Sequence, residues 1–124
     1  MQEAFRYARP IVSERAWRPA VDVCETPEDI IIVAELAGVR KEEIEVTLDS
    51  DLIRIAGRRA EPAITEKLRC HQLEINFGEF ERILRLSSPI IPEKVTALYQ
   101  DGFLQVTLPK RPQKERERIE INVE

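Results

Sequence analysis

The residues with reactive side chains are few in this sequence, and their spacing does not predict a catalytic or metal centre. His71 is the only histidine, and it directly follows Cys70. Neighbouring side chains in a strand point to opposite faces, so this pair is not expected to hold one metal ion, and His71 is expected on the surface. Cys24 and Cys70, the two cysteines, lie far apart in the chain and in no metal-ligand spacing. We expect free, buried thiols, with a disulfide as the alternative.

Acidic residues gather at Glu42, Glu43 and Glu45 and again at Glu79 and Glu81. Two carboxylates can work as a general acid and base. No nucleophile beside a base accompanies them, however, and charge runs are usually solvated faces. The 4 glycines are each typical of a turn or bulge rather than of a phosphate-binding loop. The sequence therefore predicts no enzyme and no cofactor.

Composition and charge exclude further classes of protein. The chain has 124 residues, enough for one domain with short arms, and its 34% charged and 43% hydrophobic residues are typical of a soluble globular protein. A net charge of −4 provides no basic surface for a nucleic acid backbone. The N-terminal stretch MQEAFRYARPIVSERAW lacks the continuous apolar run of a signal peptide or membrane span. We expect a cytoplasmic protein that binds neither nucleic acid nor membrane.

Apolar and polar residues alternate along most of the chain, and a period of two predicts β-strands. The first strand is expected at a sheet edge, and the second, which is almost wholly apolar, is expected to be covered on both faces. Turns at residues 49–51 and 101–102 predict hairpins, the first of them closed by Gly57. The predicted strands cover residues 21–23, 30–35, 44–48, 52–56, 73–77, 80–86, 95–100 and 103–108. About eight short strands predict an all-β sandwich of two antiparallel sheets.

Two segments do not fit inside such a sandwich. Residues 58–69 are polar and irregular, which is long for a connection within a compact domain, and we expect them to reach outward. At the C-terminus, a charged run precedes ERIEINVE, in which Ile119, Ile121 and Val123 alternate with polar residues. The charged run is expected to stay extended in water, while the alternation favours docking of Ile119 and Ile121 in an apolar slot beside a sheet edge. The alternative is a final strand within the same molecule, and the pattern leaves open whether Val123 also docks.

Several stretches together resemble the small heat-shock protein family, whose domain is the α-crystallin domain. The sequence ELAGVRKEEIEV, followed by LIRIAGRR, is similar to the first half of that domain. FGEFERILRL resembles its aromatic-glycine-x-phenylalanine-x-arginine pattern, at Phe77, Gly78, Phe80 and Arg82. ALYQDGFLQVTLPK resembles the family signature, at Ala97, Gly102, Phe103, Leu104, Leu108, Pro109 and Lys110. The resemblance covers residues 17–110 and the tail.

The resemblance implies an immunoglobulin-like antiparallel β-sandwich at residues 17–110, a short N-terminal arm at 1–16 and an extended C-terminal tail at 111–124. It also implies dimers that assemble into a larger homo-oligomer, with residues 58–69 exchanging a short strand between partners. The implied activity is that of a stress-response chaperone, a holdase that binds non-native client proteins without ATP. A co-chaperone with a CS domain and a purely structural assembly protein are the alternatives.

The resemblance also implies roles for particular residues. Ile119 and Ile121 match the tail motif that docks in a groove lined here by Val46, Leu48, Thr96 and Leu98. Arg82 matches a structural arginine that pairs with carboxylates at or near the dimer contact, the alternative being an exposed and unpaired arginine. Gly102 and Leu104 match structural or dimer-interface positions. Contacts with clients or between arms are expected from Phe5, Tyr7, Ile11 and Trp17, although Pro10 argues against one continuous helix in the arm. The chain differs from the family pattern at Ser87 and Ser88, which precede Pro89.

Overall fold

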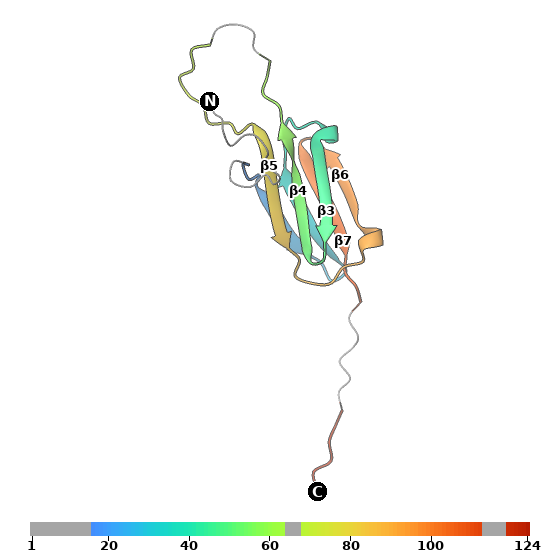
Figure 1. Cartoon of the computed structure of the whole chain (residues 1–124). Coiled ribbons are helices and arrows are strands. Elements are labelled where there is room, and N and C mark those ends of the chain that lie inside the picture. The colour runs from blue at the N-terminus through green and yellow to red at the C-terminus, as the bar shows by residue number, and fades with distance from the viewer. Residues whose placement is uncertain (1–15, 64–67, 113–118) are drawn as a thin grey trace.

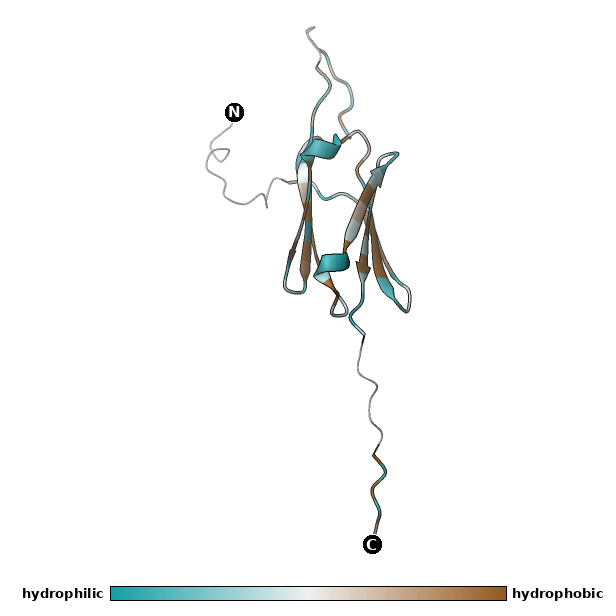
Figure 2. Cartoon of the chain, turned by 90° about the vertical axis from the view of Figure 1, so that its right-hand side faces the viewer, coloured by the Kyte–Doolittle hydropathy of each residue, from teal (hydrophilic) through white to brown (hydrophobic). Residues whose placement is uncertain are grey.

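The computed structural model describes residues 16–63, 68–112 and 119–124. Within them, the chain folds into two antiparallel sheets that pack face to face (Figure 1), and Figure 2 shows the two layers edge-on. One sheet has the order β1-β2-β7-β6, made by Val21–Glu25, Asp29–Glu35, Phe103–Pro109 and Thr96–Gln100. The other has the order β3-β4-β5, made by Ile44–Asp49, Leu52–Arg59 and Gly78–Arg85. Two short 3₁₀ turns, η2 (Lys41–Glu43) and η3 (Pro92–Lys94), precede β3 and β6. The predicted all-β sandwich is confirmed.

The core lies between the sheets and follows the alternation of the sequence. Every second residue of β2 and β7 points inward, and these side chains meet Ile53 and Ile55 of β4 and Phe80 of β5. Each fully buried aliphatic side chain contributes about 1.5–3 kcal/mol to the stability of the fold. The inward set of β2 and β7 comprises Ile30, Ile32, Ala34, Leu104, Val106 and Leu108, all of them buried.

Most of the predicted strands are confirmed, with three corrections, of which the strand predicted at residues 73–77 is described below. β1 is an edge strand, and the turns before β4 and β7 connect hairpins, as expected. The prediction that β2 is covered on both faces is wrong, because its outer residues Ile31 and Val33 are only half-buried. No layer of this chain packs on that face in the described ranges. Gly57 does not close the first hairpin but lies inside β4, opposite Ile44 and Phe80.

The prediction of a strand at residues 73–77 is wrong for the single chain. Residues 72–77 form no strand, and the side chains of Leu73 and Ile75 are 83% and 70% exposed. The sequence of this segment alternates, but the segment pairs with no strand in the described residues. β5 begins only at Gly78, whose φ of +88° interrupts the extended backbone. β4 continues to Arg59, so the outward excursion expected at residues 58–69 begins two residues later and extends further.

Neither cysteine is buried, which corrects the prediction of buried thiols. Cys24 and Cys70 are free, as predicted, but both are exposed. Cys24 lies opposite Ile31 in β2 and so shares the uncovered outer face of the four-stranded sheet. His71 is exposed, in agreement with the prediction.

Gly57 permits the close approach of three elements. A Cβ atom at this position would lie 1.9 Å from the carbonyl oxygen of Glu43 and 2.8 Å from Cζ of Phe80. The first contact is with backbone, which cannot rotate away. A side chain here would therefore separate η2 from β4 and displace the phenyl ring at the centre of the core.

We predict that Gly57→Ala destabilises the protein by about 1–3 kcal/mol, because it overpacks this contact. Urea unfolding measures the change. Gly78→Asn is the matched control, since a Cβ at Gly78 meets nothing within 4 Å and asparagine tolerates a positive φ. A Gly57→Ala variant as stable as this control would contradict the explanation.

Candidate functional site

β3, an edge strand of one sheet, and β6, an edge strand of the other, lie on the same side of the sandwich (Figures 1 and 2). Along β3, Ile44, Val46 and Leu48 point inward and are half-buried against the core. Val46 and Leu48 face inward as a groove lining requires. We call the inward-facing residues of the two strands, together with Val95 just before β6, the edge slot.

The predicted lining on β6 is displaced by one residue. Thr96 and Leu98 lie opposite Thr107 and Gln105 of β7, so they point to the outer face of the sheet. The inward face is formed instead by Ala97 and Tyr99, which lie opposite the buried Val106 and Leu104, and by Val95, which packs on the core. Because side chains alternate with a period of two, a shift of one residue exchanges the two faces.

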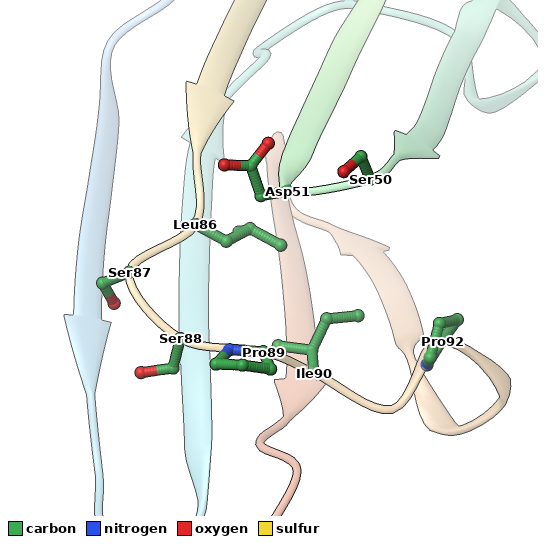
Figure 3. Close-up of a pocket in the computed structure, with 8 residues that line it drawn as sticks. All are labelled: Ser50, Asp51, Leu86, Ser87, Ser88, Pro89, Ile90 and Pro92. Carbon is green, nitrogen blue, oxygen red and sulfur yellow. The ribbon is translucent and has the colours of Figure 1, made fainter.

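The two ends of the edge slot differ. At one end, the hydroxyl of Tyr99 lies 2.7 Å from the carbonyl oxygens of both Leu36 and Val39, which fixes the ring in place. At the other end lies a cavity of about 460 Å³. It sits between the turn that follows β3 and the η3 turn that precedes β6. Its lining, drawn in Figure 3, consists of Ser50, Asp51, Leu86, Ser87, Ser88, Pro89, Ile90 and Pro92.

The tail residues 119–124 form no strand in this structure, which corrects the alternative of a final strand within the same molecule. Figure 1 shows this segment away from the sandwich. Ile119, Ile121 and Val123 are 74%, 81% and 94% exposed. Three apolar side chains on alternate positions are therefore available to another surface. The charged run proposed as a tether lies largely outside the described residues.

The start of the tail is held firmly against the sandwich. The Lys110 ammonium lies 2.6 Å from Oε1 of Glu25 and donates to the carbonyl oxygen of Thr26 at 2.8 Å. The backbone N–H of Arg111 donates to the carbonyl oxygen of Pro89 at 2.9 Å. Hydrogen bonds from Lys110 and Ser87 lower the pKa of the Glu25 carboxyl. A lowered pKa means that this link is complete above the ordinary pKa of glutamate and is lost as the pH falls through the lowered value.

Arg59 connects three segments at the opposite end of the sandwich. Its guanidinium lies 4.2 Å from the centre of the Trp17 ring and 5.6 Å from that of Phe77. It donates to the carbonyl oxygens of Asn76, at 2.5 and 2.9 Å, and of Ala37, at 3.1 Å. Arg59 thus connects Trp17, which precedes β1, with Asn76, near the end of the segment between β4 and β5. Nothing in the sequence pattern distinguished Arg59 from its neighbour.

Trp17 is half-buried and belongs to the fold. Its backbone exchanges hydrogen bonds with Glu79 and Glu81 of β5, and its indole N–H donates to the carbonyl oxygen of Gly78 at 3.2 Å. The ring packs on Phe80, with centroids 5.4 Å apart. A client contact at Trp17 stays a prediction, and the other predicted contacts, Phe5, Tyr7 and Ile11, lie outside the described residues.

Arg82 donates to a carbonyl within the chain. Its Nη1 donates to the carbonyl oxygen of Pro19 at 2.9 Å, and its buried Nε has no hydrogen-bond partner in the described ranges. The carboxylates nearby belong to the opposite, outer face of this sheet, where Arg54 lies 2.6 Å from Glu81 and 2.6 Å from Glu45 and has a pKa raised mainly by Glu81. Sequence reasoning missed Arg54, although opposite charges at neighbouring positions of adjacent strands are a usable signal. Pairing of Arg82 at a dimer contact stays a prediction.

Gly102 and Leu104 support the fold of the single chain. Gly102 has a φ of +85°, and its carbonyl oxygen accepts a hydrogen bond from the N–H of Leu36 at 2.7 Å. A Cβ at Gly102 would lie 3.1 Å from Cα of Ala37. Leu104 is a buried core residue. Their structural role is thus explained without a partner, and a role at a dimer interface stays a prediction.

No metal or membrane feature is found in the part of the chain that the structure describes. It contains no group of three or more His, Cys, Asp or Glu that could hold a metal ion. It also contains no helix that is long and apolar enough to cross a membrane.

Comparison with known proteins agrees with this arrangement of strands. Residues 22–124 match the model of the Hsp20/alpha crystallin family. The chain belongs to this family. The spore protein SP21 of Stigmatella aurantiaca is 38% identical over 106 residues, which cover 86% of this chain and 63% of that protein. The chain therefore spans slightly less than two thirds of this relative.

Solved structures of small heat-shock proteins have the same fold. Heat shock protein 16.0 from Schizosaccharomyces pombe matches with a TM-score of 0.73 and 26% identity, covering 91% of this chain and 81% of that one. A small heat-shock protein from Xylella fastidiosa matches with a TM-score of 0.70 and 28% identity, covering 86% and 98%. The sandwich described above is thus the α-crystallin domain that the sequence predicted.

We predict that Arg59→Ala exposes Trp17, because the guanidinium lies 4.2 Å from the centre of the indole ring and shields it from water. Trp17 is the only tryptophan, so its fluorescence reports this site alone. The emission should shift to longer wavelength and acrylamide should quench it more strongly. Arg58→Ala removes the same charge from the neighbouring exposed position and serves as the control. Identical spectra for the two variants would contradict a role for Arg59 in holding Trp17.

Proposed function

We propose that this protein is an ATP-independent chaperone, a holdase that forms an oligomer built from dimers and binds unfolding proteins. One observation carries the proposal: two segments with alternating apolar residues, one around Leu73 and Ile75 and the other around Ile119 and Ile121, are exposed and pair with no strand of the described residues. Membership of the family supports it, since small heat-shock proteins are chaperones rather than enzymes. The sequence argument makes the cytoplasm its proposed compartment.

The proposed dimer contact joins the segment at residues 71–77 to the edge strand β1 of a partner. No strand of the described chain pairs with the outer edge of β1, and its inward-facing Val23 is half exposed. An added strand would satisfy the free backbone groups of this edge and cover Val23 with Leu73 or Ile75. The sequence prediction located the exchanged strand within residues 58–69, and the exposed apolar pair favours a later position.

The proposed contact between dimers is the docking of Ile119 and Ile121 in the edge slot of a neighbour. Burying two isoleucines contributes about 3–6 kcal/mol, whereas ordering three or four tail residues costs about 1–2 kcal/mol each. A single docked tail is therefore weak. Several tails in one assembly raise the effective concentration of each, which gives an oligomer that is stable and still exchanges subunits. The related Xylella fastidiosa protein is described as having a distinct high order structure, which supports assembly here.

Client binding follows from release of the same surfaces. A slot without a tail and an unpaired β1 edge expose apolar side chains beside free backbone groups, and both features attract extended apolar segments of an unfolding protein. The charged residues, 34% of the chain, would keep the complex soluble.

We expect the intact protein to suppress heat aggregation of a thermolabile enzyme at an equimolar subunit ratio without ATP, as measured by light scattering. The mechanism needs only exposed apolar surface and no catalytic turnover. Oligomers that form normally but give no protection would overturn the chaperone proposal and leave the role of a purely structural assembly protein.

We predict that the double substitution Ile119→Ala and Ile121→Ala lowers the mass of the oligomer towards that of a dimer, because it removes most of the apolar area of the tail. Multi-angle light scattering after gel filtration measures the mass. Glu120→Ala with Asn122→Ala is the matched control, since it changes two residues of the same segment on its other face. An unchanged mass in the isoleucine variant would mean that the tail does not link dimers.

A further inference from the structure

We propose that Val123 is a third docking residue of the tail and that Ile121 occupies the centre of the edge slot, over Ala97. The inference rests on the proposed docking of the tail and extends it. Docking by two isoleucines would use only part of the apolar surface along the open side of the sandwich.

The edge slot matches the tail in length. Residues on one face of a strand are two positions apart, about 6.6 Å. Ile119, Ile121 and Val123 repeat at this spacing, so an extended tail presents three apolar side chains over about 13 Å. Each edge of the slot also presents three inward-facing residues at the same spacing: Ile44, Val46 and Leu48 on one side and Val95, Ala97 and Tyr99 on the other. Two docked residues would leave one of these three levels unfilled.

The middle level of the slot has the smallest side chain, that of Ala97. β3 and β6 run in opposite directions along the open side, because η2 and η3, which precede them, lie at opposite ends of the sandwich (Figure 1). Val46 and Ala97 are the central inward-facing residues of the two edges. Ala97 faces inward, opposite the buried Val106, and yet is exposed, because its methyl group is small. This opening between the edges accepts a large aliphatic side chain.

The assignment of Ile121 to this level does not depend on the direction of the tail. Reversing an extended segment exchanges the positions of Ile119 and Val123 but leaves the central residue in place. Both end levels can hold a side chain. Tyr99 forms a fixed wall at one end, while the other end adjoins the cavity of about 460 Å³ whose apolar lining includes Leu86 and Ile90 (Figure 3).

Val123→Thr tests the third contact, because threonine keeps the β-branched shape and replaces one methyl group by a hydroxyl. Asn122→Thr is the matched control, with the same new residue on the opposite face of the tail. We expect Val123→Thr to raise the concentration at which the oligomer dissociates on dilution, by about tenfold, and Asn122→Thr to leave it unchanged. The mass is followed by light scattering on the full chain.

Ala97→Val tests the central level, because it fills the opening with a residue that favours strands. Thr96→Val, on the outer face of the same strand, is its control. Oligomers of Ala97→Val should dissociate at higher concentration than those of Thr96→Val, while circular dichroism shows that both variants keep their fold. Equal dissociation of these two variants would overturn the central position of Ile121.

The alanine variants of Ile119 and Ile121 separate this inference from the proposed function. If they dissociate while Val123→Thr behaves like Asn122→Thr, the third contact is overturned and docking of the tail stands. If the isoleucine variants also keep the mass of the intact protein, both proposals are overturned.

Discussion

Unpaired strand edges are the constraint on which the rest of this structure depends. Two open sheets have four edges, and every edge presents backbone N–H and C=O groups that need partners. The chain covers part of one edge itself, where Trp17 bridges to Phe80 beside β5. The edges at β1, β3 and β6 have no strand partner within the described residues. Two alternating apolar segments, around Leu73 and Ile75 and around Ile119 and Ile121, pair with no strand in the described residues, and the proposed assembly would bring them to the open edges of other molecules.

The interior that supports these edges is small and tightly fixed around Phe80. Its ring lies under Gly57 of β4 and against Trp17, and Arg59 covers the outer face of that indole. Trp17, the core of one sheet and Arg59 at the end of β4 therefore share one stack of side chains. Because these side chains are in contact, a change in the position of Trp17 would also displace Arg59 and the end of the segment between β4 and β5.

The strands could be predicted from alternation because one face of each contacts the core. Alternation did not predict the structure of residues 73–77, where Leu73 and Ile75 alternate with polar residues but are exposed and form no strand within the described chain. It also failed at Ala97, Leu98 and Tyr99, where three consecutive apolar residues hide which face is buried and only the pairing with Val106 reveals it. The cysteines were placed in the core by residue type alone, and Cys24 lies on an outer face that no other layer covers.

Arg59 and Arg54 show a different limit of prediction from the sequence. Charged residues are common in the chain, and their partners are set by the twist and register of the strands rather than by a local pattern. Arg54 reaches Glu45 and Glu81 because β3 and β5 flank β4. The contacts of Arg59 to Asn76 and Ala37 come from loops whose paths the sequence did not define.

The ion pair between Lys110 and Glu25 makes the two ends of the sandwich different from each other. The tail leaves the sandwich at the pole where this ion pair lies, whereas the excursion after β4 leaves at the pole of Trp17 and Arg59 (Figure 1). The sandwich lies between these two ends, so the proposed contacts of the segment between β4 and β5 and those of the tail would start from opposite ends of the molecule (Figure 1). In the proposed assembly, the length and twist of the sandwich would therefore set the distance and angle between the two kinds of contact.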